Sequence, residues 1–187
     1  RAAAGYSPWS GVLGPSFAAT ARVGRRGGPP ALTPPAGFGG ALVLGRQARG
    51  RMSALERERP EPIVPVERHS EVDERVTIGG EVLRPLTATE TRRGADDGVA
   101  GGASSVACGL LLSFLHPEHE RHLAAAMREH GLFGSASIDV SPGYREYERM
   151  STTAINAYVS PVMQGYLGNL QRELNGIPYQ YLSTSNI

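Results

Sequence analysis

The sequence contains no lysine, so all 19 of its basic residues are arginine. This absence excludes a Schiff-base lysine and the lysine of a phosphate-binding P-loop within the chain. Any phosphate group bound here would have to be held by backbone amides or by arginine.

Cysteine is almost absent as well. Cys108 is the only one, which excludes an internal disulfide and suits a cytoplasmic protein. It lies in an apolar run, where a buried thiol behaves as a small hydrophobic group. No basic neighbour accompanies Cys108, and Ser113 has no nucleophile-elbow context, so neither is predicted to be a nucleophile.

Long apolar runs are missing too. The longest candidate, Val106 to Leu115, is shorter than the ~18 residues that a membrane span needs. The start at Arg1 lacks the apolar core of a secretion signal, so a soluble, cytoplasmic protein without a membrane partner is expected. The formal net charge is only +1 and the arginines are scattered among acidic residues, which argues against a nucleic-acid partner.

Glycine and proline, in contrast, are abundant in the first half of the chain. The 187 residues suffice for one domain, or one and a fraction. Residues 1–36 hold few large apolar side chains, so this segment is expected to be loop or disordered. Residues 41–47 form a short apolar run that fits either a strand or the end of a helix.

Two elements are predicted in the middle of the chain. Residues 75–78 and 81–84 flank Gly79-Gly80, which predicts a β-hairpin with a two-residue turn. Thr87 with Glu90 three residues later forms a capping-box pattern, so a glycine-weakened helix is expected over 87–102.

A strand, a helix and a second strand are predicted next. The unbroken apolar run from Val106 fits a strand buried on both faces of a parallel sheet. Pro117 suits the first position of a helix that ends near Gly131, and residues 135–140 supply the following strand. This order predicts a right-handed βαβ unit and hence the α/β fold class.

The last region is predicted to be a long helix. Its large apolar residues follow helical spacing: Ile155, Tyr158, Val159, Val162, Met163, Tyr166, Leu167, Leu170 and Leu174. Pro161 interrupts this stripe, so we expect either a kink or a break with Ser160 as a new cap.

A cluster of histidines and glutamates is the first candidate for chemistry: His116, Glu118, His119, Glu120 and His122. Histidines three residues apart on a helix share a face and could bind a metal with a further ligand from elsewhere. The alternative, which we favour, is a helix start whose two glutamates complement the positive end of the helix dipole.

The second candidate is Ser151-Thr152-Thr153, followed by Asn156. Hydroxyls at a helix N-terminus lie beside free amides that accept an anion, although capping alone would also explain Ser151. Arg149 would add a forked donor, or would simply pair with nearby glutamates. Arg46, at the end of an apolar run, is a further ligand candidate or an ordinary surface arginine.

Six ordered blocks resemble the hydantoinase/oxoprolinase family over about residues 37–175. They are Gly45-Arg-Gln47, Pro60-Glu-Pro-Ile-Val-Pro65, Glu74-Arg-Val with Gly80-Glu-Val-Leu83, Ser113-Phe-Leu-His-Pro-Glu-His-Glu-Arg121, Ser141-Pro142 with Arg145-Glu-Tyr-Glu-Arg149, and Ser151-Thr-Thr with Asn156-Ala-Tyr-Val159. The last block is most similar to the hydantoinase A (N-methylhydantoinase A) branch.

This resemblance implies part of an actin-like ATPase (ribonuclease H-like) fold. It implies 37–147 as part of the family's N-terminal domain and 148–187 as the start of the hydantoinase A domain. It further implies an enzyme that uses ATP and Mg²⁺ to phosphorylate the carbonyl oxygen of a cyclic amide before water opens the ring. A hydantoinase B type subunit is the implied partner.

The chain also departs from the family. The family's glycine-rich phosphate loop and its C-terminal half are missing, which suggests an internal fragment that is inactive alone. On the same resemblance, Arg46, Arg149, Thr152, Thr153 and Asn156 are candidates for the substrate or phosphate region. Two alternatives stay open, a non-catalytic remnant or assembly module and a protein like the acetone carboxylase β subunit.

Overall fold

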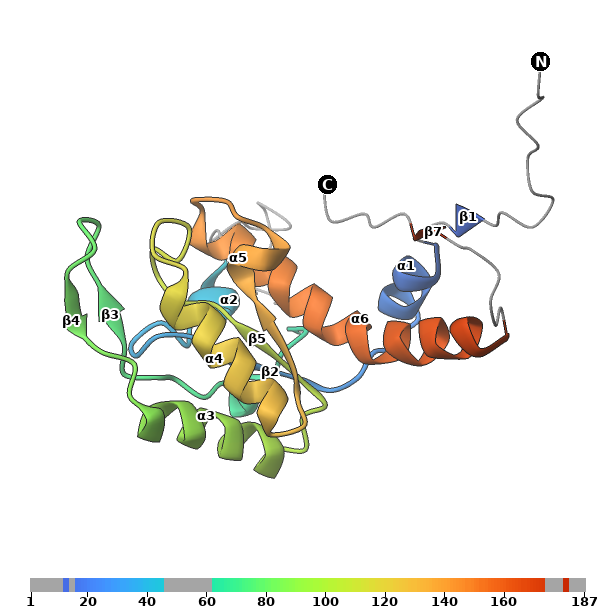
Figure 1. Ribbon diagram of the computed structural model, residues 1–187, viewed down its shortest axis with the longest axis horizontal. Coiled ribbons are helices and arrows are strands. Elements are labelled where there is room, and N and C mark those ends of the chain that lie inside the picture. The colour runs from blue at the N-terminus through green and yellow to red at the C-terminus, as the bar shows by residue number, and fades with distance from the viewer. Residues whose placement is uncertain (1–11, 14–15, 46–61, 174–179, 182–187) are drawn as a thin grey trace, which may run out of the picture.

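The computed structural model describes residues 12–13, 16–45, 62–173 and 180–181. Its centre is a parallel three-stranded sheet in the order β2-β5-β6. The strands are β2 (Pro30–Thr33), β5 (Ser105–Cys108) and β6 (Phe133–Ala136). Helices cover both faces of this sheet (Figure 1), so the predicted α/β class with a parallel sheet is confirmed.

Alternate residues of the strands point to the two faces of the sheet. Val106 and Cys108 pack with Leu123 on the side of α3 (Ala88–Ala100) and α4 (Glu118–Glu129). Ala107, between them, packs with Ala157 on the side of α6 (Glu146–Glu173). Burial on both faces explains why β5 reads as an unbroken apolar run.

The predicted βαβ unit is present, because β5, α4 and β6 follow one another and the two strands pair in parallel. Its second strand ends earlier than expected, since residues 137–140 turn into the short helix α5 (Ser137–Val140). The Ser137 hydroxyl and the Ile138 amide both donate to the buried Glu120, which bends the chain out of the sheet.

The expectation that residues 1–36 are loop or disordered is wrong for two segments. Residues 16–23 form helix α1 (Ser16–Val23), which packs on α6, and β2 is a fully buried strand of the central sheet. The sequence did not indicate this strand because the segment has few large apolar residues. Pro30, Ala31 and Leu32 are nevertheless buried, because neighbouring elements cover them. A two-stranded parallel pair, β1 (Val12–Leu13) with β7 (Gln180–Tyr181), lies beside α1.

The predicted hairpin is confirmed by the antiparallel strands β3 (Arg75–Val76) and β4 (Val82–Arg84). Its turn is longer than the predicted Gly79-Gly80 pair, because the Gly80 amide donates to the Thr77 carbonyl. Gly80 has φ +85°, a left-handed conformation that favours glycine.

Two helices decide between alternatives, or test a cap, predicted from the sequence. The run 41–47 begins as α2 (Ala41–Leu44), so helix is correct for its described part. In α3 the Thr87 hydroxyl accepts from the Glu90 amide, as predicted. The Glu90 carboxylate instead accepts from the Asp73 amide, so only half of the capping box forms.

Helix α6 continues through Pro161 without a break (Figure 1). The predicted cap at Ser160 is wrong, because its hydroxyl donates to the Asn156 carbonyl within the helix. The helix axis changes direction along its course, as a proline kink requires. Among the described helices, none is both long and apolar enough to cross a bilayer.

The face of α6 that contacts the sheet is not the predicted stripe. The buried side chains are Arg149, Met150, Thr153, Ala154, Ala157 and Ser160. The predicted Ile155, Tyr158 and Val159 are only half-buried. Small residues let α6 approach the sheet closely, and the larger apolar side chains then flank the contact.

Candidate functional site

The loops after the three parallel strands meet at the carboxyl edge of the sheet, which is the usual place for ligands in open α/β folds. A network of buried polar side chains joins two of these loops. Its centre is Glu120, in the first turn of α4, which is 0% exposed.

Glu120 accepts hydrogen bonds from both loops. Its Oε2 lies 2.7 Å from the Leu110 amide nitrogen and 2.7 Å from the Ser113 hydroxyl, both in the loop after β5. The same oxygen is 3.0 Å from the Ser137 hydroxyl, and Oε1 is 2.9 Å from the Ile138 amide nitrogen. The expectation that Glu120 only complements the helix dipole is therefore wrong.

Arg149 completes the network from α6 and is also 0% exposed. Its guanidinium donates to the Ser137 hydroxyl (2.8 Å), the Gly143 carbonyl (2.9 Å) and the Leu110 carbonyl (2.7 Å). It also pairs with the Glu146 carboxylate and lies over the ring of Phe114. Four of its five N–H donors are bonded to groups of this chain and the side chain is fully buried, so Arg149 braces the loops.

Glu146 is the partly exposed member of the network. It accepts from the Leu112 amide at 3.1 Å, at a residue with the unusual φ of +57°. Burial raises the pKa of Glu146, and the hydrogen bond from the Leu112 amide and the charge of Arg149 oppose that shift. The loop after β5 is thus held in a strained turn by two carboxylates and one arginine.

The other predicted site residues fall in different places. Because α6 begins at Glu146, the run 151–153 lies inside the helix, and the prediction of a helix N-terminus there is wrong. Thr153 is 0% exposed and donates to the Arg149 carbonyl. Asn156, half-buried, donates to the Ser135 hydroxyl at 3.0 Å, and Thr152 is half-buried nearby. Arg46 lies outside the described residues.

The histidine cluster does not gather around a metal. Among the described residues no group of three or more histidine, cysteine, aspartate or glutamate side chains could hold one. His116 Nε2 lies 3.3 Å from the Ile78 carbonyl oxygen, and His122 is exposed. His119 Nδ1 lies 2.7 Å from Oε1 of Glu74, which is 2% exposed.

The loop after β2 is held by a second acidic clamp. The Glu71 carboxylate accepts from the amides of Gly37 (2.9 Å) and Gly39 (2.8 Å). His69 joins the same loop to its own segment, because Nδ1 lies 2.7 Å from the Gly39 carbonyl oxygen and Nε2 lies 3.2 Å from that of Val64. A Cβ at Gly39 would lie 2.5 Å from Oε1 of Glu71, so a side chain there would displace the carboxylate from the amides it binds.

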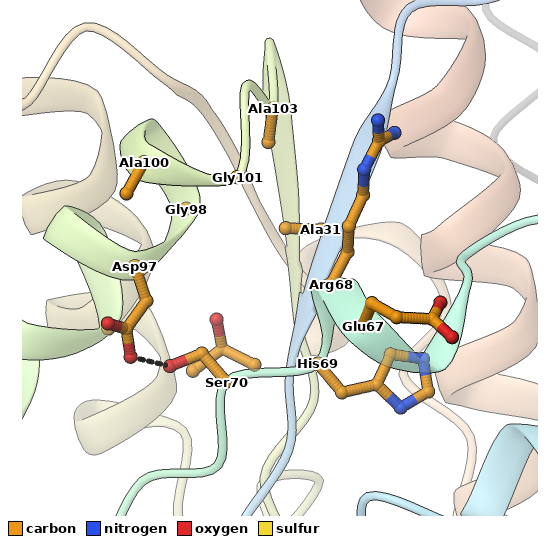
Figure 2. Close-up of a pocket in the computed structure, with 12 residues that line it drawn as sticks. Ala31, Glu67, Arg68, His69, Ser70, Asp97, Gly98, Ala100, Gly101 and Ala103 are labelled. Carbon is orange, nitrogen blue, oxygen red and sulfur yellow. Dashed lines mark hydrogen bonds between the residues drawn. The ribbon is translucent and has the colours of Figure 1, made fainter.

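An open cavity of about 280 Å³ lies beside β2, between α3 and residues 67–70 (Figure 2). Small residues of α3 and its C-terminal turn line it, and its polar wall is the Ser70 hydroxyl donating to Asp97 at 2.6 Å. Figure 2 shows the Arg68 and His69 side chains directed away from Asp97. Of the predicted site residues that the structure describes, none lines this cavity.

Sequence reasoning singled out neither Glu74 nor Ser137 as a site residue, and it named Glu120 without predicting its buried bracing role. A signal for Glu120 was present, because it shares the spacing i, i+3, i+4, i+7 with Leu123, Ala124 and Met127, the buried face of α4. The exclusion of Cys108 as a nucleophile fits its surroundings. It is fully buried, and this burial raises the pKa of its thiol far above the usual range.

The sequence profile of the hydantoinase/oxoprolinase N-terminal region matches residues 12–131. The chain belongs to the hydantoinase/oxoprolinase family. The match begins before residue 37, where the resemblance in the sequence was first evident, and it includes α1 and β2. Residues 12–36 of the divergent first segment are therefore part of the family match.

Several relatives of this hydantoinase/oxoprolinase chain have named functions. The caprolactamase subunit alpha of Pseudomonas jessenii is 31% identical over 56% of this chain and 15% of its own length. The acetophenone carboxylase gamma subunit of Aromatoleum aromaticum is 29% identical over 71% and 19%. The 5-oxoprolinase of Saccharomyces cerevisiae is 26% identical over 87% and 15%.

Two solved structures share the fold. The ATP-dependent caprolactamase from Pseudomonas jessenii aligns with a TM-score of 0.77 at 24% identity, over 92% of this chain and 26% of that one. A nucleotide-free acetone carboxylase aligns with a TM-score of 0.71 at 24% identity, over 88% and 25%. The chain spans 14% to 21% of the length of the curated relatives it matches.

The described residues of this family member do not fit ATP. The chain has no lysine, Arg149 is buried with four of its five N–H donors bonded to groups of this chain, and the part described holds no metal-binding cluster. The charged side chains that line the cavity beside β2 are of both signs, Glu67 and Asp97 with Arg68, so it offers phosphate no cluster of cations. We therefore derive no chemical step through ATP from these residues.

Proposed function

We propose that this chain is part of an ATP-dependent hydrolase that opens cyclic amides of the hydantoin or 5-oxoproline type. The observation that carries the proposal is the family match over residues 12–131. Two relatives named as caprolactamase and 5-oxoprolinase support a lactam as substrate.

In this proposal, phosphorylation of the ring carbonyl oxygen by ATP with Mg²⁺ makes the carbonyl carbon electrophilic enough for water to attack. The nucleotide site is assigned to parts of the parent protein outside this chain, so the chain alone is expected to be inactive. In this proposal the chain itself supplies the carboxyl edge of the central sheet, which Glu120, Ser137 and Arg149 hold rigid. Thr152 and Asn156 remain proposed contributors to the substrate region.

The parent fold is proposed to be actin-like, with residues 37–147 in the N-terminal domain and 148–187 at the start of the hydantoinase A domain. A companion subunit of the hydantoinase B type is the proposed partner. Relatives named as alpha and gamma subunits support a multi-subunit enzyme. The proposed location is the cytoplasm, consistent with a single buried cysteine.

An alternative is a carboxylase that acts on a ketone, in the manner named for acetophenone and acetone carboxylases. A non-catalytic remnant or assembly module is the other alternative, since no phosphate loop lies within these residues. Sequencing the genomic DNA on both sides of the region that encodes this chain would distinguish the remnant from an enzyme, because an enzyme requires a phosphate loop encoded upstream.

The test is an assay of the full-length parent, with its companion subunit, against hydantoin, 5-oxoproline, caprolactam and acetone. Ring-opened product and ADP from a cyclic amide would support the hydrolase. Bicarbonate-dependent turnover of acetone alone would support the carboxylase, and no turnover of any substrate would support the remnant.

A further inference from the structure

Two buried carboxylates lie near the start of α4, and they differ in how far their oxygens are satisfied. Glu120 accepts from two backbone amides and two hydroxyls. Glu74 is also buried, yet among the described residues its carboxylate is hydrogen-bonded to His119 alone, and its Oε2 has no hydrogen-bond partner. A buried carboxylate that is incompletely hydrogen-bonded is costly, which requires an explanation beyond packing.

The geometry fixes the tautomer of His119. A carboxylate accepts and does not donate, so the ring nitrogen 2.7 Å from Glu74, Nδ1, carries the hydrogen. In the neutral ring Nε2 is then the acceptor. The side chain of His119 is 25% exposed while that of Glu74 is 2% exposed, so the imidazole connects a buried charge with the surface.

The position of this pair is also distinctive. His119 lies in the first turn of α4, directly after the loop at the carboxyl end of β5. In the neighbouring His116 the contact with the protein is made by Nε2, which lies 3.3 Å from the Ile78 carbonyl oxygen, whereas in His119 it is made by Nδ1. His122 lies about one turn further along α4 and is exposed, and it is not paired with Glu74.

We propose that Glu74 and His119 form a carboxylate–imidazole dyad in which Nε2 of His119 transfers protons during ring opening. This inference rests on the proposed function. Glu74 is the positioning residue, because it holds the ring in the Nδ1–H tautomer, as in the hydrolase triads.

The step balances with two waters, because the ring carbonyl oxygen carries the phosphoryl group from ATP. The oxygen of the first water bonds to the carbonyl carbon while one of its protons passes to Nε2. The ring C–N bond then breaks with its electron pair on nitrogen, and that nitrogen takes the proton of the imidazolium and that of the new hydroxyl, which leaves an acyl phosphate and an amine. The second water cleaves the acyl phosphate to a carboxylic acid and inorganic phosphate.

The first test measures turnover by the full-length parent on the cyclic amide that it opens. Removing a general base costs about 100-fold or more, so His119→Gln is expected to lower kcat by that factor. Glu74→Leu should lower kcat by about 10- to 100-fold, as expected for a positioning partner. The matched control is His122→Gln, which should keep the wild-type kcat.

Chemical rescue separates proton transfer from a purely structural role. Added imidazole should restore part of the activity of His119→Ala and none of that of Glu120→Gln. Wild-type turnover in His119→Gln, or no rescue of His119→Ala, overturns the dyad while the hydrolase proposal stands. Failure of the wild-type parent to open any cyclic amide overturns both.

The second test needs no turnover. Nitrogen-15 NMR of the histidine rings should show Nδ1–H with an unprotonated Nε2 for His119 above the pH at which the ring is charged. Glu74→Leu should abolish that preference, with the other amide resonances unchanged. The Nε2–H tautomer in the wild-type protein would overturn the dyad even if the variants failed to fold.

Discussion

Glu120→Gln is the most informative single substitution, because it removes one charge from a fully buried site and keeps the shape of the side chain. The wild-type carboxylate accepts four hydrogen bonds with its two oxygens. A glutamine has one acceptor oxygen, and its amide group must face either the Leu110 or the Ile138 N–H. One backbone donor therefore loses its acceptor in either orientation.

The magnitude follows from these contacts. An unsatisfied buried donor costs roughly 1–3 kcal/mol, and each remaining bond weakens by about 1 kcal/mol when the acceptor becomes neutral. Relief from burying a charge offsets part of this loss. We expect the free energy of unfolding to fall by about 3 kcal/mol.

Urea unfolding followed by far-ultraviolet circular dichroism measures this change. With a slope of about 2 kcal/mol/M, the midpoint should shift down by about 1.5 M. Glu118→Gln is the matched control, because Glu118 is exposed in the same helical turn and loses only about 0.3–1 kcal/mol of helix-dipole interaction. Equal midpoints for the two variants would refute the bracing role of Glu120.

Three further predictions concern the same core. Arg149→Met should lower the free energy of unfolding by about 3–5 kcal/mol, since it leaves the carboxylate of Glu146 without its cation and the Gly143 carbonyl without its donor. A loss below about 1 kcal/mol by urea titration would argue against it. Gly134→Ala should lower the free energy of unfolding by about 1–3 kcal/mol, because its Cβ would lie 2.3 Å from the Ala124 carbonyl oxygen. Gly143→Ala is the control and should leave the thermal melt almost unchanged, because no atom lies within 4 Å of its Cβ. Burial raises the pKa of Cys108, so the folded state keeps the thiol proton that the unfolded state releases above pH ~8.5. The free energy of unfolding should therefore fall by up to about 1.4 kcal/mol per pH unit above that value. Urea titrations of Cys108→Ala should no longer show this slope.

The sequence predicted the core of the fold because its local signals agreed with the tertiary contacts. The apolar run at β5, the proline and glycine around α4, and the Thr87 cap each correspond to an observed element. The strand β2 was missed because Pro30 and Ala31 have little strand propensity, and their burial comes from pairing with Ser105 and Val106 far along the chain.

The candidate site was harder to predict, because its members are held by contacts between distant segments. Arg149 was identified as a donor to an anion, yet its partners are groups of its own chain at residues 110, 137 and 143. Thr153 was placed at a helix terminus because the hydroxyl run Ser151-Thr152-Thr153 is typical of a helix start. The helix begins five residues earlier, at Glu146, which pairs with Arg149 across its first turn.

The most direct test of the central claim is a count of products from one reaction of the full-length parent with its companion subunit. The claim predicts that the ring-opened amino acid and ADP accumulate in equal amounts, and that neither forms without the other. ADP release that is independent of any cyclic amide, or ring opening without ATP, would contradict it.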